Sequence, residues 1–212
     1  MKDLSDYRKS YEKSELDEAH APDFPMELFG KWFQDAEATS SGEEVNVMTV
    51  STIGLDGFPK ARIILLKKYD ADGFTFFTNY GSEKGKAIAA NPNICLSFFW
   101  PQTERQVIIK GVAEKVPQAD SDEYFLSRPK GSRLGALASN QSEVIASRKV
   151  IDDRLAELEQ VYPGDDVPRP ETWGGYLVRP LEVEFWQGRA NRLHDRIRYR
   201  KENGWIRERL SP

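Results

Sequence analysis

The sequence predicts a mainly β fold with flanking helices, in which antiparallel strands form a closed or nearly closed barrel. Between residues 45 and 114 apolar and polar side chains alternate with period two, which is typical of strands that bury one face. Three dipeptides favour tight hairpin turns: Asp56-Gly57, Asp72-Gly73 and Asn203-Gly204. Seven or more antiparallel strands with few helices are typical of a barrel.

The first half of the chain should contain an arm, one long helix and five strands. Residues 1–24 are charged and weakly apolar, and we expect a mobile arm or an irregular helix unless a partner surface orders them. A helix should start after Pro25, because five apolar residues recur one turn apart as a core-facing stripe: Leu28, Phe29, Trp32, Phe33 and Ala36. The expected strands are 45–53, 60–69, 73–79, 94–100 and 105–115, with a short helix near 83–90.

The second half should begin with helices and end with strands. Helices are expected at 120–127 and 143–161. Trp173 opens a second β segment, and a final hairpin should join strands 197–200 and 205–209. We therefore expect an arm over residues 1–24 and a single domain over 25–212.

Composition narrows the class of protein. The chain has 212 residues and a formal net charge of -4, which argues against bulk nucleic-acid binding. Cys95 is the only cysteine and the two histidines are far apart, so neither a disulfide nor a metal site is expected. No run approaches the roughly 20 apolar residues of a membrane span. A cytoplasmic protein without a membrane segment is the expectation.

One segment near the C-terminus indicates an anion site. If residues 192–196 were extended, Arg192, His194 and Arg196 would share a face, beside a possible aromatic wall at Trp186. Residues 189–201 hold six Arg or Lys and one acid, Asp195. Such a surface suits a phosphate or a phenolate, because arginine offers a fork of donors and histidine can donate or accept. The alternative is the solvated face of an edge strand.

Further segments could also bind anions. Arg62 and Lys67 are the basic ends of an apolar strand, and Lys84 lies at the start of a helix whose amides and dipole favour phosphate. Ser142 could cap the helix 143–161 and leave amides facing a ligand. Tyr124, Arg128 and Ser132 could form a phosphate cradle. The alternatives are strand ends in solvent, plain helix caps and an ordinary surface.

No pattern supplies a nucleophile with its base, so a bound cofactor is expected to perform any chemistry. Taken together, the segments resemble the pyridoxamine 5'-phosphate oxidase family, FMN enzymes that make pyridoxal 5'-phosphate. The resemblance rests on RIILLK (62–67), TNYGSEK (78–84), ERQV (104–107), YFLSRPKGS (124–132), SNQS (139–142), WGG (173–175), EFWQG (184–188), RLHDR (192–196) and the ending 205–212. It implies an FMN-binding split β-barrel that works as a homodimer with two FMN sites at the subunit interface.

The resemblance also implies roles for individual residues. FMN would be held by Arg62, Ile63, Ile64, Leu65, Leu66, Lys67, Phe77, Thr78, Lys84, Gln106, Gln141, Ser142, Trp186 and Arg196. The substrate phosphate would be held by Lys67, Tyr124, Arg128 and Ser132, and the pyridine ring would meet Arg192, Leu193 and His194. Arg8 and Tyr11 match an N-terminal segment that covers the substrate.

The implied reaction belongs to vitamin B6 metabolism. Pyridoxamine or pyridoxine 5'-phosphate would be oxidised at C4' by hydride transfer to FMN, and O₂ would reoxidise the flavin and yield H₂O₂. Arg192 would clamp the substrate over the flavin as the catalytic residue, while His194 would assist by hydrogen bonding.

Two positions depart from the family pattern. Glu83 stands where an arginine usually precedes the lysine, and Leu137 stands where an aromatic is common. An acid in the first helical turn suits the dipole, so Glu83 is expected to turn outward from the phosphate. The alternative functions are a split-barrel FMN reductase or oxidoreductase with another substrate, and a non-catalytic carrier of pyridoxal 5'-phosphate or flavin.

Overall fold

The computed structural model describes residues 2–212 and confirms a mainly β molecule with flanking helices. Its strands are β1 (Val47–Ile53), β2 (Pro59–Leu65), β3 (Lys68–Asp70), β4 (Gly73–Asn79), β5 (Asn93–Trp100), β6 (Arg105–Lys115), β7 (Trp173–Gln187), β8 (Asp195–Lys201) and β9 (Trp205–Leu210). Its helices are α1 (Pro25–Thr39), α2 (Glu83–Ala90), α3 (Gln118–Ser127), α4 (Lys130–Ala138) and α5 (Lys149–Val161), with a 3-10 turn at Ala190–Arg192.

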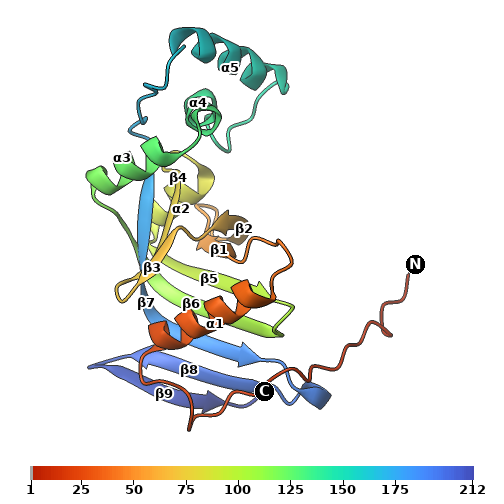
Figure 1. Cartoon of the computed structure of the whole chain (residues 1–212). Coiled ribbons are helices and arrows are strands. Elements are labelled where there is room, and N and C mark those ends of the chain that lie inside the picture. Colours follow the sequence, from red (N-terminus) through yellow and green to blue (C-terminus); the bar gives the residue numbers. More distant parts are fainter. Residues whose placement is uncertain (1) are drawn as a thin grey trace.

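The strands form one antiparallel sheet that curls around the core (Figure 1). Its hydrogen-bonded order is β2-β1-β5-β6-β7-β4-β3, and β8 and β9 extend it from the second half of β7. The two ends of this path, β2 and β3, are separated in the chain by Leu66 and Lys67 alone. The Leu66 amide donates to the Asn46 carbonyl (2.9 Å) and the Lys67 amide to the Thr75 carbonyl (2.8 Å). The chain therefore changes partners there, and the barrel is split between β2 and β3.

The core lies between α1 and the inner face of the sheet. All five residues of the predicted stripe on α1 are buried. Phe29 is fully buried, and its ring is 4.8 Å from that of Phe74 on β4 and 5.2 Å from that of Phe98 on β5. Trp32 packs edge-on against Phe185 of β7, at 5.2 Å. The helix thereby ties β4, β5 and β7 into one core.

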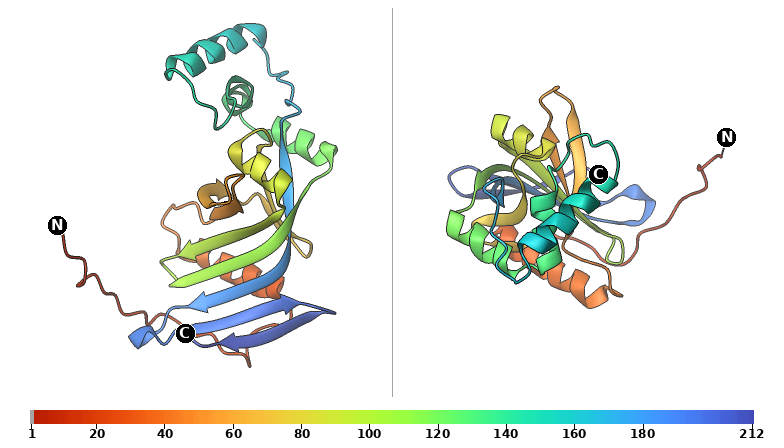
Figure 2. Two further views of the ribbon diagram at one scale, coloured as in Figure 1. Left: turned by 180° about the vertical axis from the view of Figure 1, so that it is seen from behind. Right: turned by 90° about the horizontal axis from the view of Figure 1, so that it is seen from above.

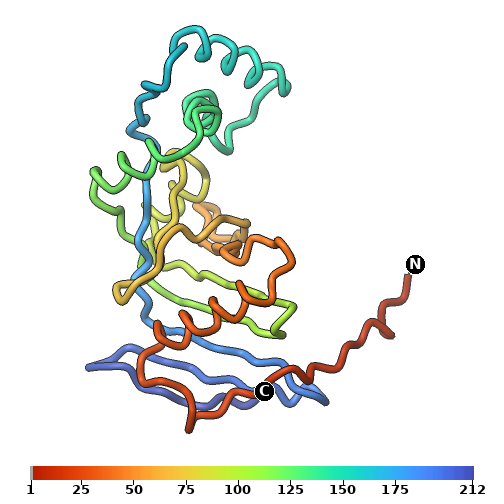
Figure 3. Tube along the Cα trace, in the orientation of Figure 1, coloured from red at the N-terminus to blue at the C-terminus, as the bar shows by residue number. Residues whose placement is uncertain are grey.

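The N-terminal arm runs along the hairpin made by β8 and β9 (Figure 3). Within residues 2–24 the backbone forms turns but neither helix nor strand. Leu16 is buried, and its amide donates to the Asp195 carboxylate at 3.1 Å. The Tyr199 hydroxyl donates to the Pro22 carbonyl at 2.7 Å. The sequence predicts a mobile or irregularly helical arm unless a partner orders it, whereas contacts within the same chain hold the arm at Leu16 and Pro22.

Helices α3, α4 and α5 gather at the end of the molecule that lies farthest from β8 and β9 (Figure 2). They share a small second core with the start of β7, formed by Phe125, Leu134, Leu158, Val167 and Trp173. The sequence pattern did not predict α4 as a helix, and the expected helix 143–161 begins only at Lys149. Among residues 2–212, none of the helices has both the length and the apolar character needed to cross a bilayer.

Candidate functional site

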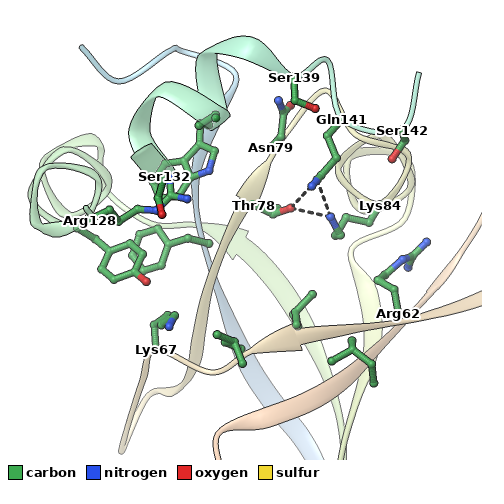
Figure 4. A pocket seen from close by; sticks show the side chains of 18 of the residues that line it. Arg62, Lys67, Thr78, Asn79, Lys84, Arg128, Ser132, Ser139, Gln141 and Ser142 are labelled. Atoms are coloured by element: carbon green, nitrogen blue, oxygen red, sulfur yellow. Dashed lines mark hydrogen bonds between the residues drawn. The ribbon is translucent and has the colours of Figure 1, made fainter. Parts of the chain in front are cut away.

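A cavity of about 900 Å³ opens where β2, β4 and the start of β7 face α2, α3 and α4 (Figure 4). Most of the predicted FMN and phosphate residues line it: Arg62, Ile63, Ile64, Leu65, Lys67, Phe77, Thr78, Lys84, Tyr124, Arg128, Ser132, Gln141 and Ser142. Leu66 is the exception within its segment, because its side chain is buried in the main core. The structure therefore brings residues from five separate predicted motifs into one hollow.

One end of the cavity is built around the buried ammonium of Lys84. Its Nζ donates to Thr78 Oγ1 and to Gln141 Oε1, both at 2.8 Å. Ser82 caps α2 by accepting the Gly85 amide at 3.2 Å, as expected for a helix start in this position. Burial, aided by the nearby Arg62 charge, lowers the pKa of Lys84 to about 8. A positive charge held in this environment is stabilised when an anion binds beside it.

Arg62 lies beside Lys84 at the same end. Its guanidinium donates to Thr52 Oγ1 at 2.7 Å and to the Lys60 carbonyl at 2.9 Å. Glu83 also lines the cavity, and its carboxylate lies 2.5 Å from Lys60 Nζ. The acid at the family's arginine position is therefore paired with a lysine, and it remains at the rim of the cavity.

The other end of the cavity is aromatic and cationic. Tyr124 stacks on Phe77 with ring centroids 4.0 Å apart, and Trp173 continues the stack 5.6 Å from Phe77. The Arg128 guanidinium lies 4.7 Å from the Trp173 ring. Its buried Nη1 has no hydrogen-bond partner among the described residues, and burial lowers the pKa of Arg128. An unpaired buried donor of this kind is costly unless a ligand accepts from it.

The two ends give the cavity two separate cationic centres. In Figure 4, Arg62 and Lys84 lie on one side of the hollow, while Arg128, Ser132 and Lys67 lie on the other. A cavity of this size is at the upper end of the roughly 300–1,000 Å³ that ligand sites occupy. The arrangement suits two phosphorylated ligands, or one long ligand with an anion at each end.

The remaining predicted FMN residues lie outside this cavity, in a row across the outer face of the sheet. Gln106 of β6 is opposite Trp186 of β7, which is opposite Arg196 of β8. Directly opposed residues of antiparallel strands point to the same face. Trp186 is separated from Trp173, in the wall of the cavity, by roughly 40 Å of strand. Arg196 is already paired, with Glu184 at 2.8 Å.

Beside this row, Tyr11 and His194 join Trp186 in an aromatic cluster. The rings of His194 and Tyr11 lie 4.6 Å and 5.7 Å from that of Trp186. Gly188 makes room for the arm, because a Cβ there would lie 2.7 Å from Tyr11 Cγ. His194 Nδ1 accepts from the Arg189 amide at 3.1 Å. Burial and the Arg192 charge lower the pKa of His194, so at neutral pH its remaining nitrogen, Nε2, carries the proton and can donate.

The expected extended strand over 192–196 is wrong at its start. Ala190–Arg192 forms a 3-10 turn in which Asn191 and Arg192 have φ of 55° and 61°, and β8 begins at Asp195. Arg192 and Leu193 are therefore exposed on the turn, and only His194 and Arg196 border Trp186. Positive φ in non-glycine residues is uncommon and marks positions that the surroundings hold in place.

The expected basic patch is largely neutralised by carboxylates. Within residues 189–201 ion pairs join Arg189 to Asp195 and Glu15, Arg196 to Glu184, Arg198 to Glu208, and Arg200 to Glu202 and Glu208. Of these acids, Glu15 comes from the arm, Glu184 from β7 and Glu208 from β9, so sequence distance conceals these three. Arg192, in the same segment, is exposed and makes none of these ion pairs.

Ser142 does not cap a helix as expected. Its φ is 77°, and it lies in the loop between α4 and α5, where it still lines the cavity. Arg8 is exposed and its Nε donates to the Ser5 carbonyl at 3.1 Å, which leaves it outside the aromatic cluster. Leu137 packs in the second core, so its substitution for an aromatic affects packing there.

Lys60 and Glu104, to which the sequence pattern gave no role, lie beside predicted site residues. Lys60 lines the cavity two residues before Arg62, and the period of a strand could have placed both on one face. Buried Glu104 has φ of 57°, and its carboxylate accepts the amides of Glu12 (2.9 Å) and Lys13 (3.1 Å). Burial raises the pKa of Glu104, but these bonds and Lys9 lower it overall. Glu104 thereby fixes the arm next to Tyr11, a contact across more than 90 residues that no local pattern reveals.

Comparison of the sequence with known proteins shows the family to which this chain belongs. Residues 35–162 match the family model described as pyridoxamine 5'-phosphate oxidase, and residues 173–212 match a pyridoxine 5'-phosphate oxidase C-terminal dimerisation region. Pyridoxine/pyridoxamine 5'-phosphate oxidases of Flavobacterium johnsoniae and Leptospira biflexa are 62% and 50% identical, each over the whole of both chains.

Two solved structures resemble this protein over most of its length. PhzG from Burkholderia lata, in complex with tetrahydrophenazine-1-carboxylic acid, gives a TM-score of 0.88 at 27% identity, covering 96% of this chain and all of that one. A pyridoxamine 5'-phosphate oxidase-related, FMN-binding protein from Nostoc punctiforme gives 0.70 at 16% identity, covering 89% of this chain and 98% of that one, and shares the fold.

Proposed function

The chain belongs to the pyridoxamine 5'-phosphate oxidase family and oxidises pyridoxine 5'-phosphate and pyridoxamine 5'-phosphate to pyridoxal 5'-phosphate, and we propose that it does so with FMN bound in the cavity. Two separate cationic centres in one cavity carry this proposal. FMN and the substrate each bear one phosphate, and each centre offers one binding site for such a group.

The residues of the first centre fit the FMN phosphate. Lys84 lies in the first turn of α2, where the helix dipole adds positive potential, and Arg62 of β2 lines the same end of the cavity. The desolvated ammonium of Lys84 gains a counter-charge when a phosphate binds, which restores its preference for the charged form. The apolar residues of β2 that line the cavity can contact a flat ring system.

The residues of the second centre fit the phosphate of the substrate. The orphan Nη1 of Arg128 would donate to a phosphate oxygen, and the Tyr124 and Ser132 hydroxyls and the Lys67 ammonium line the same end of the cavity. With both phosphates held, the pyridine ring would lie between the two centres. FMN would supply a two-electron acceptor at that point. O₂ would serve as the final oxidant and would leave as H₂O₂.

A second subunit completes the site in this proposal. One chain carries the cavity and the aromatic cluster at different ends of β7, and a match to a dimerisation region supports a homodimer. We propose that the cluster of the partner subunit, with Gln106, Trp186 and Arg196, closes the cavity over FMN. Arg192 would then clamp the substrate ring, and His194 would donate from Nε2 to its phenolic oxygen without transferring a proton.

The N-terminal arm would cover the substrate once it has bound. Tyr11 packs on Trp186 and His194, and Glu104 holds the adjoining amides of the arm. Arg8, three residues before Tyr11, is exposed and would reach the substrate from the same side. A closed site excludes water and sharpens the hydrogen bonds that orient the ring.

The deciding experiment is an oxygen-electrode assay of the FMN-supplemented protein with pyridoxine 5'-phosphate, with the aldehyde product followed by absorbance. Matched oxygen uptake and aldehyde formation are expected. A yellow protein that consumes no oxygen would favour a reductase or a carrier. A protein that stays colourless after incubation with FMN would contradict the proposed cofactor.

A further inference from the structure

Lys60 and Glu83 form an ion pair at the rim of the cavity, next to the cations of the first centre. Lys60 Nζ lies 2.5 Å from Glu83 Oε2, and both side chains are about half-exposed and line the cavity. Lys60 precedes Arg62 by two residues on β2, so the two side chains leave the strand on the same face. Glu83 directly precedes Lys84 at the start of α2. The pair thus links the two elements that carry the first centre.

The pair sets the net charge at this end of the cavity. Lys60, Arg62 and Lys84 are cations and Glu83 is an anion, which leaves two net positive charges. A phosphate monoester carries close to two negative charges at neutral pH, because its second pKa is about 6. Without Lys60, the Glu83 carboxylate would face the phosphate uncompensated and would repel it.

The geometry of the ion pair leaves donors on Lys60 that can bind a ligand, in addition to neutralising the charge of Glu83. An ammonium has three donors, and the bond to Glu83 uses one of them. We infer that Lys60 is a binding residue for the FMN phosphate and that Glu83 positions it by holding its ammonium at the rim of the cavity. The inference rests on the proposed binding of FMN, and it explains how the site accommodates an acid where an arginine is common.

The test compares the affinities of FMN and riboflavin, which differ only in the phosphate. Apo-protein is titrated with each flavin, and quenching of the flavin fluorescence gives the dissociation constant. Lys60→Met should weaken FMN binding about fivefold, a modest loss because the side chain is half-exposed. Riboflavin binding should not change, which would also show that the variant is folded.

Two further variants separate contact from charge. Lys86→Met removes an exposed lysine from α2, the helix that carries Glu83. Lys86 does not line the cavity, so this variant should change the FMN affinity by less than about twofold. Lys60→Met combined with Glu83→Gln keeps the net charge of the wild-type site. The double variant should still bind FMN more weakly than wild type, because the contact from Lys60 is missing.

Three results would overturn the inference. The first is unchanged FMN binding by Lys60→Met, and the second is a loss of riboflavin affinity in that variant as large as its loss of FMN affinity. The third is full recovery of FMN affinity in the double variant, which would show that Lys60 only neutralises the charge of Glu83. If the wild-type protein itself fails to bind FMN, both the proposed cofactor and the inference about Lys60 are wrong. Normal wild-type binding with an unaffected Lys60→Met variant would reject the inference alone.

Discussion

At the scale of single residues, the site depends on charges that are partly withdrawn from water. Lys84 and Arg128 are both desolvated, which lowers the pKa of each, and each lies in a position where a phosphate would supply a counter-charge. His194, by contrast, is held neutral with its proton on Nε2. In the proposed site, Lys84 and Arg128 are therefore cations that bind phosphates, and His194 is a neutral donor that orients the substrate ring.

FMN affinity should depend on pH through Lys84. Its pKa of about 8 means that the free protein holds the ammonium charged below pH 8 and neutral above it. Binding of the dianion favours the charged form, so above pH 8 binding requires uptake of a proton. The dissociation constant should rise by up to about tenfold per pH unit above pH 8. Flavin titrations from pH 7 to 9 would measure this, and Lys84→Arg should flatten the profile because arginine stays charged.

Variants of Arg192 and Arg62 should show that turnover and cofactor binding depend on different residues. Arg192→Ala should lower kcat on the order of a hundredfold through loss of ring positioning, yet keep flavin bound. Arg62→Ala should release FMN during gel filtration. Absorbance of the eluted flavin with steady-state rates would test both, and a colourless Arg192→Ala protein would contradict the division of roles.

At the scale of elements, the sequence predicts features that are set by local periodicity and misses features that depend on distant contacts. The stripe on α1 and the hairpin turns were predictable because a helix or a turn repeats a local rule. The split at Leu66 and Lys67 was not, because it arises where the chain exchanges Asn46 for Thr75 as its partner. The predicted helix 143–161 begins only at Lys149, because a local pattern was misleading there. Val144 continues the apolar pattern of the helix, but it is fully exposed in a loop.

The same distinction holds for the candidate site. Basic strand ends and a capped helix identified Arg62 and Lys84 as anion-binding candidates, and the resemblance supplied Gln141. The expected row of Arg192, His194 and Arg196 failed because two left-handed residues break the strand. Backbone conformations of that kind are fixed by tertiary packing, which alternation along the sequence does not encode.

Helix α1 should contribute much of the stability of the fold. Phe29 is fully buried among the aromatic rings of β4 and β5. Phe29→Ala should lower the free energy of unfolding by about 3–5 kcal/mol, since it leaves a cavity in that cluster. Urea unfolding at a fixed protein concentration would measure the change, with exposed Lys31→Ala on the same helix as the control. A loss below about 1 kcal/mol would show that the cluster collapses around the gap.

The arm should be released when its anchor on Glu104 is removed. Glu104→Gly deletes the carboxylate that accepts the amides of Glu12 and Lys13, and glycine tolerates the left-handed backbone at this position. Trypsin should then cleave after Lys13 at least about fivefold faster, because local opening limits cleavage. Exposed Glu37→Ala is the control, and equal cleavage rates in the three proteins would show that the hairpin contacts alone hold the arm.

At the scale of the whole molecule, β7 determines how the site is assembled. Its first residue, Trp173, is in the wall of the cavity, and its end carries Trp186 beside His194 and Tyr11. A twisted strand of 15 residues holds these two regions apart. If the partner subunit completes each site, every active site combines the first half of β7 from one chain with the second half from the other.

This separation within β7 implies that two inactive proteins can rescue one another. In a mixed dimer of Arg62→Ala and Arg192→Ala chains, both lesions fall in one site and the other site is intact. Random reassortment of equal amounts would leave about a quarter of all sites unmutated. Two dead alleles expressed together should therefore restore growth to a cell that depends on this enzyme, whereas either allele alone should not.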